Sequence, residues 1–257
     1  KRAEVASRRA AVDARQVAQR AEAAGNVRAF FSAVTAAAPP VRVIAEVKRA
    51  APSAGLIRED FDPATIARAY ADAGAAAISC LTDEKYFQGR LEYIAAIRNA
   101  VALPVLRKDF IIDPFQVDEA RAAGADAILL IAECIKDDGL LRELARHADR
   151  LGMASLIEIY EPANLDRVMP LLEDDSLPRV LLGINNRDLR TMTTDLAHTL
   201  DLLPRLPDPA RLVSESGIRT RDDIERLLAH GVGRVLVGEH LMRQPDLAAA
   251  LRDLIQS

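Results

Sequence analysis

Short apolar segments and amphipathic segments alternate along most of this chain. Segments with the composition of buried strands lie at 43–48, 76–81, 104–108, 126–131, 153–158, 179–184, 211–215 and 234–237. Segments with the periodicity of helices follow them in turn, at 62–73, 90–100, 114–123, 137–151, 161–173, 195–203, 220–230 and 245–256. Parallel strands need crossovers of this kind, and eight strand–helix units are the number that closes a parallel sheet on itself. The alternation therefore predicts an α/β fold, a (β/α)8 TIM barrel.

Residues with known preferences for helix ends mark several of these boundaries. Asp62-Pro63 and Asp113-Pro114 each place an N-cap carboxylate before a proline at the first helical position. Glycine is common just past a helix, because it adopts the left-handed conformation at little cost. Four glycines follow predicted helices in this way: Gly74, Gly124, Gly152 and Gly231.

The first 40 residues precede the predicted barrel. Residues 3–24, rich in Ala, Arg and Glu, indicate one helix, and 27–37 indicate a second, short helix that ends at Pro39-Pro40. No linker or low-complexity segment divides the remaining sequence. We therefore predict a single barrel domain over 1–257, with residues 1–40 as an N-terminal helical extension.

The composition limits the functions open to the chain. Its 34 Lys and Arg residues against 38 Asp and Glu give a formal charge of −4, which argues against a nucleic-acid partner. Cys80 and Cys134 lie in apolar runs without metal-ligand spacing, so we expect buried, reduced thiols. No apolar run reaches the roughly 18 residues of a membrane span. These features predict a cytoplasmic protein without a membrane partner, which we expect to be a monomer.

Charged and polar side chains interrupt the apolar strands near their carboxyl ends. Glu46 and Lys48 stand two residues apart in the first strand, so they point to the same face. Buried charges are costly unless they are paired or used, and active sites of this barrel lie at the carboxyl ends of its strands. Polar residues end four later strands in the same way: Lys108, Glu158, Asn185 and Glu215. We therefore predict an active site at this end, against the alternative that Glu46 and Lys48 form only a structural ion pair.

The ends of the last two strands also suggest an anion site. Ser216-Gly217 follows the seventh strand, and Gly238-Glu239 follows the eighth. Loops at these two positions often bind phosphate in such barrels, since glycine lets the backbone N–H groups approach an anion. The alternative is a pair of ordinary strand-to-helix turns.

Five segments together resemble the indole-3-glycerol phosphate synthase family. They are Ile44–Ser53 (IAEVKRAAPS), Leu81–Phe87 (LTDEKYF), Leu106–Phe110 (LRKDF), Gly183–Leu189 (GINNRDL) and Ser214–Ile218 (SESGI). The resemblance implies ring closure of 1-(2-carboxyphenylamino)-1-deoxyribulose 5-phosphate, with loss of CO₂ and water, to give indole-3-glycerol phosphate in tryptophan biosynthesis. It implies a carboxy-lyase that needs no cofactor and no metal.

The resemblance also implies roles for the polar strand ends. Lys108 is expected to be the general acid beside the carbonyl oxygen that gains charge during ring closure. Glu158 and Lys48 are the candidates for acid and base in the dehydration, with the division between them left open. Glu46 is expected to hold Lys48 in place. Two further residues are expected to orient sugar hydroxyls or the lysines: Asn185 and Glu215.

The remaining predicted contacts divide between the ring, the carboxylate and the phosphate. Arg187 is a candidate partner for the substrate carboxylate, because its fork fits a planar anion, although a surface pair with Asp188 is the alternative. An apolar seat for the aromatic ring is expected from Phe87, Phe110 and Ile131. The phosphate is expected to contact Ser216, Gly217, Gly238 and the backbone N–H of Glu239. Pro52 and Ser53 are expected to bind the substrate from the loop near the phosphate. Lys48 is a further candidate for reaching the phosphate.

Three positions depart from the family pattern. The loop after the first strand commonly reads Ser-Pro-Ser-Lys/Arg-Gly, whereas this chain has Ala51 and Ala54 at the first and fourth positions. His240 stands where the family often has serine after the eighth strand. We therefore expect weaker phosphate binding with the acid–base residues intact. Two alternative functions remain: another phosphosugar isomerase or aldolase on the same barrel, and a barrel that binds a phosphosugar without turnover.

Overall fold

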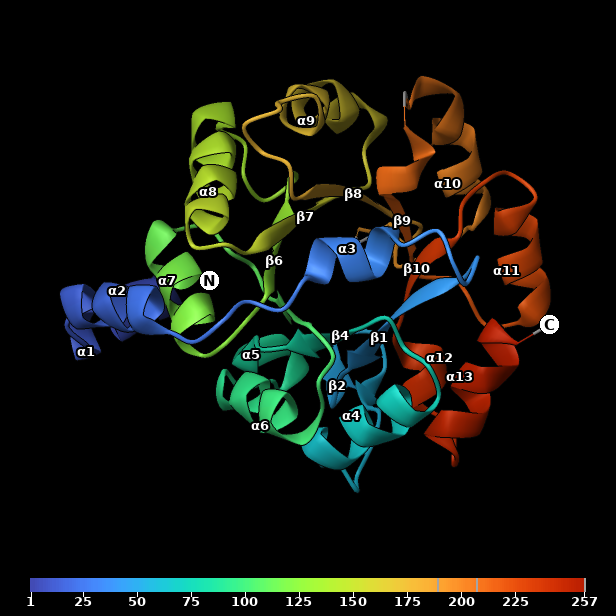
Figure 1. The fold of residues 1–257 in the computed structure, drawn as a ribbon, viewed down its shortest axis with the longest axis horizontal. Coiled ribbons are helices and arrows are strands. Elements are labelled where there is room, and N and C mark those ends of the chain that lie inside the picture. The colour runs from blue at the N-terminus through green and yellow to red at the C-terminus, as the bar shows by residue number, and fades with distance from the viewer. Residues whose placement is uncertain (189, 207, 257) are drawn as a thin grey trace.

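Eight parallel strands form a closed barrel at the centre of the molecule (Figure 1). The computed structural model describes residues 1–188, 190–206 and 208–256, so Leu189 of the fourth family-like segment lies outside the described residues. Around the barrel the strand order is β1-β10-β9-β8-β7-β6-β5-β4. The strands are β1 (Arg42–Val47), β4 (Ala77–Leu81), β5 (Val105–Lys108), β6 (Ala127–Ile131), β7 (Ala154–Ile159), β8 (Val180–Asn185), β9 (Leu212–Glu215) and β10 (Arg234–Val237). The predicted barrel is confirmed, with every strand within about two residues of its predicted position, the scatter expected for assigned ends.

A ring of helices surrounds the barrel (Figure 1). Its members are α4 (Pro63–Asp72), α6 (Glu92–Ala100), α7 (Pro114–Ala122), α8 (Asp138–Arg150), α9 (Leu165–Leu172), α10 (Ala197–Leu202), α11 (Arg221–Leu228) and α13 (Leu247–Ile255). The predicted caps are confirmed, since the Asp62 and Asp113 side chains accept hydrogen bonds from the backbone at the starts of α4 and α7. The four predicted left-handed glycines have φ of 95°, 94°, 79° and 80° in chain order. In the described part of the chain, no helix has the length and apolar character to cross a bilayer.

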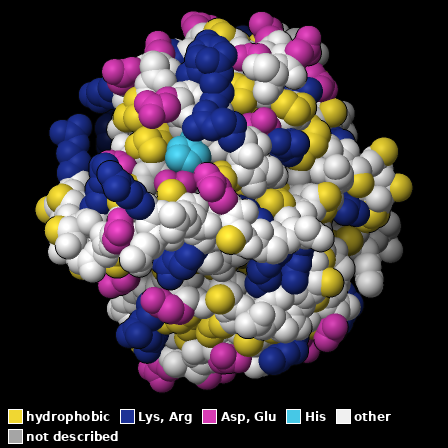
Figure 2. All heavy atoms as spheres, turned by 60° about the vertical axis from the view of Figure 1, so that its left-hand side comes forward, with side chains coloured by type: hydrophobic (Ala, Val, Ile, Leu, Met, Phe, Trp, Pro, Cys, Tyr) yellow, Lys and Arg dark blue, Asp and Glu magenta, His cyan; other side chains and the backbone are white. Residues whose placement is uncertain are grey.

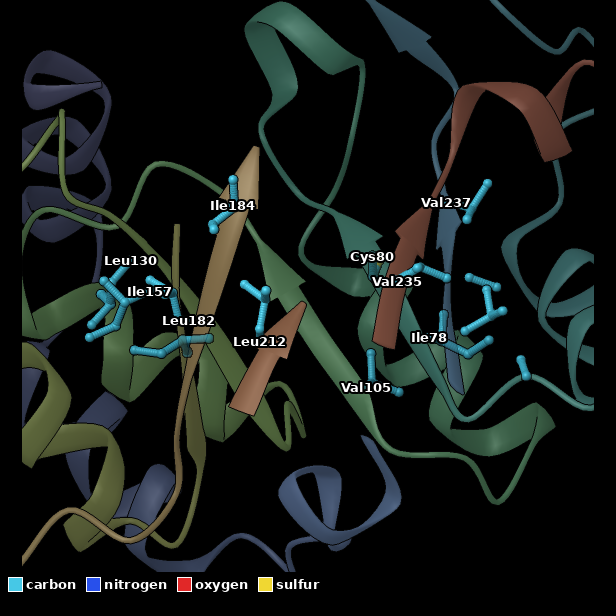
Figure 3. Close-up of a cluster of buried hydrophobic side chains, with 14 of the residues drawn as sticks. Ile78, Cys80, Val105, Leu130, Ile157, Leu182, Ile184, Leu212, Val235 and Val237 are labelled. Atoms are coloured by element: carbon cyan, nitrogen blue, oxygen red, sulfur yellow. The ribbon is translucent and has the colours of Figure 1, made fainter. Parts of the chain in front are cut away.

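Alternate residues of each strand face two different apolar layers. Outward residues such as Ile78, Val105 and Leu182 pack between the strands and the helices (Figure 3). Inward residues such as Ile44 and Leu106 fill the barrel interior. This alternation follows from the pleat of a strand, and it fixes which polar side chains can face the interior.

The N-terminal extension differs from the single long helix predicted over 3–24. It contains α1 (Arg2–Ala11) and α2 (Ala14–Ala23), followed by α3 (Phe30–Thr35). The prediction of one helix was wrong because Val12 is extended and the Asp13 side chain caps α2 by accepting a hydrogen bond from the Arg15 backbone. The helix predicted over 27–37 is shorter, and it crosses one end of the barrel in the foreground of Figure 1.

Phe30 and Val34 on α3 are buried together with the interior strand residues, so this helix closes the amino-terminal end of the barrel. α2 lies against α7 on the outside of the ring (Figure 1). α3 therefore contacts the barrel at its amino-terminal end, and α2 contacts the ring of helices along its side.

Several short elements were not predicted. A two-stranded hairpin, β2 (Ala50–Ala51) with β3 (Gly55–Leu56), follows β1, and the short helices α5 (Glu84–Phe87) and α12 (Glu239–Met242) follow β4 and β10. Three 3₁₀ turns complete the described elements: η1 (Pro162–Asn164), η2 (Leu203–Arg205) and η3 (Pro209–Arg211). The hairpin and the two short helices all lie after the carboxyl ends of strands.

Surface features agree in part with the composition. Cys80 is buried as predicted, but Cys134 is exposed. That prediction was wrong because the apolar run continues past the end of β6 into a turn, where the Cys134 N–H donates to the Ile131 carbonyl. The face shown in Figure 2 intersperses Lys and Arg with Asp and Glu, as expected from a nearly balanced charge.

Candidate active site

A cavity of about 800 Å³ opens at the carboxyl ends of the strands. Every residue for which the sequence predicts a catalytic or binding role lines this one cavity. The pleat of the strands explains why the polar side chains reach one cavity, because every second residue of a strand points to the same side. Glu46, Lys108 and Glu158 each come two residues after an apolar residue that faces the barrel interior. Those interior residues are Ile44, Leu106 and Leu156.

Lys108 lies between two carboxylates at the centre of the cavity. Its Nζ is 3.0 Å from Glu158 Oε2 and 2.8 Å from Glu215 Oε2. The three side chains come from β5, β7 and β9, so the arrangement depends on closure of the barrel. Burial opposes the ammonium form, but the two carboxylates outweigh it and raise the pKa of Lys108.

The two carboxylates that share Lys108 are not equivalent. Burial and the nearby charge of Glu158 raise the pKa of Glu215 to about 8, although Lys108 opposes the shift. Burial acts on Glu158 too, but the Lys108 ammonium and a 3.0 Å hydrogen bond from Asn185 Nδ2 hold its pKa below the ordinary value. At neutral pH the site therefore holds one ionised carboxylate, one protonated carboxyl and one ammonium.

A second ion pair lies beside this group. Glu46 Oε1 is 2.5 Å from Lys48 Nζ, and both residues are buried. The predicted pairing on one strand face is confirmed as a contact. Gly238 makes room for it, because a Cβ at that position would overlap the Glu46 carboxylate. A Cβ at Gly183 would likewise overlap the Glu215 carboxylate.

Asn185 and Arg187 link Glu158, the ionised carboxylate beside Lys108, to Glu239 after β10. The Asn185 Oδ1 accepts a hydrogen bond from the Arg187 backbone N–H at 3.0 Å. The Arg187 guanidinium is 3.2 Å from Glu239 Oε2 and faces the cavity. Asp188 pairs instead with Arg190, so the alternative surface pair between Arg187 and Asp188 is wrong.

One end of the cavity is aromatic and apolar. The rings of Phe87 on α5 and Phe110 after β5 lie with centroids 6.4 Å apart and an interplanar angle of 42°. Ile131 is buried at the end of β6 and lines the same cavity. Tyr86 also lines it and was missed, because α5 has too short a sequence pattern to be recognised.

Backbone turns and basic side chains form another part of the wall. Ser216 and Gly217 have φ of 67° and 82°, and Gly238 immediately precedes α12. His240, Arg219 and Arg243 line the cavity with them, and no role for these three was predicted. Burial and the neighbouring Arg219 lower the pKa of His240, so this side chain is neutral at pH 7.

The whole chain is similar in sequence to one known protein family. The family model for indole-3-glycerol phosphate synthase matches residues 1–254. The chain belongs to the indole-3-glycerol phosphate synthase family. It is 55% identical over 227 residues to the synthase of Rhodopirellula baltica, covering 88% of this chain and 85% of that relative. It is 50% identical over 256 residues to the synthase of Rhodospirillum rubrum, covering 99% of this chain and 95% of the relative.

Solved structures with the same barrel are more distant in sequence. One is 3-hexulose-6-phosphate synthase from Salmonella typhimurium, with a TM-score of 0.65, 17% identity and coverage of 84% of this chain and 97% of that chain. Another belongs to the tryptophan synthase complex of Pyrococcus furiosus, with a TM-score of 0.58, 13% identity and coverage of 85% and 98%. At these identities the likeness shows the fold alone, so membership of the synthase family rests on the sequence matches.

Proposed function

We infer that the protein is an indole-3-glycerol phosphate synthase, a carbon–carbon lyase of tryptophan biosynthesis. It converts 1-(2-carboxyphenylamino)-1-deoxyribulose 5-phosphate to indole-3-glycerol phosphate, CO₂ and water. Beside the family match, the observation that carries the inference is Lys108, held by Glu158 and Glu215 inside a cavity with an aromatic end. The following steps assign the reaction to residues.

Lys108 is proposed as the general acid of ring closure. The ring carbon that bears the carboxylate attacks the C2 carbonyl carbon, a C–C bond forms, and negative charge develops on the carbonyl oxygen. A buried ammonium beside that oxygen stabilises the charge and donates the proton. The raised pKa of Lys108 keeps it charged before the reaction, and an alkoxide is basic enough to take its proton.

Loss of CO₂ from the same ring carbon then restores the aromatic ring. Dehydration follows: the new hydroxyl leaves as water after protonation, and the adjacent CH₂ loses a proton to form the indole double bond. Glu158 is suited to accept a proton because it is ionised in the free site, and Lys48 is suited to donate one as an ammonium paired with Glu46. Under this division Glu46 and Asn185 position the two groups.

Binding is proposed to use the two kinds of cavity wall. The aromatic ring rests against the apolar wall formed by Phe87, Phe110 and Ile131. The substrate carboxylate meets Arg187, which would exchange part of its contact with Glu239 for the ligand. The phosphate meets the backbone of Ser216–Gly217 and Gly238–Glu239, next to Pro52 and Ser53. Arg219 and Arg243 add positive charge to the part of the cavity that meets the phosphate. This charge offsets part of the loss of phosphate affinity expected from Ala54 and His240.

The direct test is a continuous fluorescence assay of indole-3-glycerol phosphate formation from the purified chain, without added metal. We expect indole fluorescence to grow with time and inorganic phosphate to inhibit competitively. Binding of the substrate without product would indicate a barrel that only binds. Absence of binding would overturn the assignment in favour of another phosphosugar reaction.

A further inference from the structure

The side chain of Lys1, at the start of α1, is buried against the carboxyl end of the barrel. Its Nζ lies 2.7 Å from Asp83 Oδ2 and 2.7 Å from Asp109 Oδ1. The Lys1 side chain is 9% exposed, and those of Asp83 and Asp109 are 1% and 0% exposed. Burial opposes the ammonium, but these carboxylates outweigh it and raise the pKa of Lys1. The extension therefore places a buried positive charge between two loops of the barrel.

The two carboxylates differ in their other partners. Asp109 Oδ2 also accepts from Arg107 Nη2 at 2.9 Å and from Thr82 Oγ1 at 2.7 Å. For Asp83 Oδ2, by contrast, the described residues offer no hydrogen-bond partner of good geometry and no cation except Lys1. Without Lys1, the buried Asp83 carboxylate would have no compensating charge and would stand next to a second carboxylate, an arrangement that is strongly unfavourable.

Each carboxylate also fixes one aromatic residue of the cavity. Asp83 Oδ1 caps α5 by accepting from the Tyr86 N–H at 2.7 Å, and α5 carries Phe87. Asp109 Oδ1 accepts from the N–H of Phe110 at 2.8 Å. The Lys1 ammonium contacts both carboxylates, and each carboxylate holds the backbone next to or at one of the two phenylalanines. Lys1 thus links the backbone segments that carry the Phe87 and Phe110 rings, whose centroids are 6.4 Å apart.

We propose that Lys1 is a positioning residue of this enzyme: by bridging Asp83 and Asp109 it fixes where Phe87 and Phe110 lie relative to each other, and so the aromatic wall against which the substrate's ring rests. The proposal rests on the synthase function inferred above. Ring closure requires the ring carbon to approach the carbonyl closely, and a misplacement of about 1 Å can cost about 100-fold in rate.

Other contacts keep α1 in place without this charge. Arg8 Nη2 is 2.9 Å from Glu119 Oε1, and Val5 is buried with Val17 and Phe115. Lys1→Met keeps the length and apolar stem of the side chain and removes only the ammonium. We therefore expect the variant to fold with α1 docked.

The test compares steady-state kinetics of the unmodified protein and of Lys1→Met, together with the inhibition constant of inorganic phosphate. We expect kcat/KM for the substrate to fall about 10–100-fold. We expect the inhibition constant of inorganic phosphate to change less than about 2-fold, because the residues proposed to bind phosphate follow other strands, β9 and β10. A 2-fold change corresponds to a binding energy of only RT ln 2. A general loosening of the barrel would weaken phosphate binding as well, and that result would overturn the proposal.

Two further variants sharpen the result. Lys1→Met with Asp83→Asn removes the uncompensated charge and leaves an amide oxygen that still caps α5, so we expect most of kcat/KM to return. Arg9→Met removes an exposed ion pair between α1 and Asp113 (3.2 Å), and should leave kcat/KM unchanged.

Unchanged kcat/KM in Lys1→Met, or a double variant that folds and binds phosphate but stays as slow as the single one, would overturn the positioning role. The double variant also carries the test if Lys1→Met alone does not fold. Absence of turnover in the unmodified chain is a different result: it overturns the synthase function, and this inference with it.

Discussion

Replacing Lys108 with methionine tests the centre of the site most directly. The substitution keeps the length of the side chain and removes an ammonium 3.0 Å from Glu158 and 2.8 Å from Glu215. If Lys108 supplies the proton and the positive charge for ring closure, both contributions disappear together. General acid catalysis contributes about 10²–10⁴-fold, and a charge-stabilising donor contributes about 10²–10³-fold, with overlap between the two. We expect kcat to fall at least about 10³-fold, with a much smaller change in KM.

The same change should lower the free energy of unfolding. A contact of about 3 Å between unit charges amounts to about 5 kcal/mol at an effective dielectric constant near 20. Because Glu215 carries a proton at neutral pH, only the Glu158 contact is a full charge pair there. Removing one partner of a buried pair usually costs about 3–5 kcal/mol, and we expect a loss in that range at pH 7.

The sign of the pH dependence follows from the two carboxylates. Without the ammonium, burial raises both carboxyl pKa values above their unfolded values of about 4.3. The folded variant then holds more protons than the unfolded chain, so its stability falls as pH rises from about 4 through the raised pKa values. The deficit relative to the parent should be small near pH 4 and largest above pH 8.

The assay combines product fluorescence at pH 7 with urea unfolding between pH 4 and 9. Lys136→Met, at an exposed lysine in the loop after β6, is the matched control and should change neither quantity. Near-normal turnover in Lys108→Met would refute the general-acid assignment. A stability deficit independent of pH would refute the account of the two carboxylates.

Three other substitutions probe separate features. In the unmodified enzyme we expect kcat/KM to fall above about pH 8, because ionisation of Glu215 makes Lys108 a weaker acid. Glu215→Gln should remove this fall from the pH–rate profile. A profile that still falls near pH 8 in the variant would contradict the pKa of about 8 for Glu215. Gly238→Ala should lower kcat/KM about 10–100-fold in the same assay, since its Cβ displaces the Glu46 carboxylate that holds Lys48; an unchanged value would argue against a role for that pair. Arg28→Met should lower the free energy of unfolding by about 2–4 kcal/mol in urea titration, because three backbone carbonyls lose a charged donor. We expect kcat to stay unchanged. A changed kcat would show that the contacts of Arg28, away from the cavity, affect the active site.

Local sequence patterns were sufficient for the barrel and for most of the site. Strand and helix periods are set by neighbours a few residues away, so the eight units could be located from sequence. The pairing of Glu46 with Lys48 could be predicted because it depends only on the pleat of one strand. The inward direction of Lys108, Glu158 and Glu215 follows from the same alternation.

Other features depended on details that composition and periodicity do not show. The break at Val12–Asp13 could not be predicted from composition, since Ala- and Arg-rich residues on both sides favour a continuous helix. The exposure of Cys134 depended on where β6 ends and the chain turns, which an apolar run does not show. The inequality of Glu158 and Glu215 required the distances of both to Lys108 and the burial of all three.

The sequence alone determined the barrel, the faces of its strands, and the residue types available for acid–base chemistry at their ends. The tertiary structure decided which of those charges meet, because β5, β7 and β9 become neighbours of one cavity only when the sheet closes. It also decided that Lys1, more than 80 residues before Asp83 in the chain, compensates a carboxylate beside the aromatic end. No local pattern contains that pairing, since its energy arises only after the extension has docked and water has left the contact.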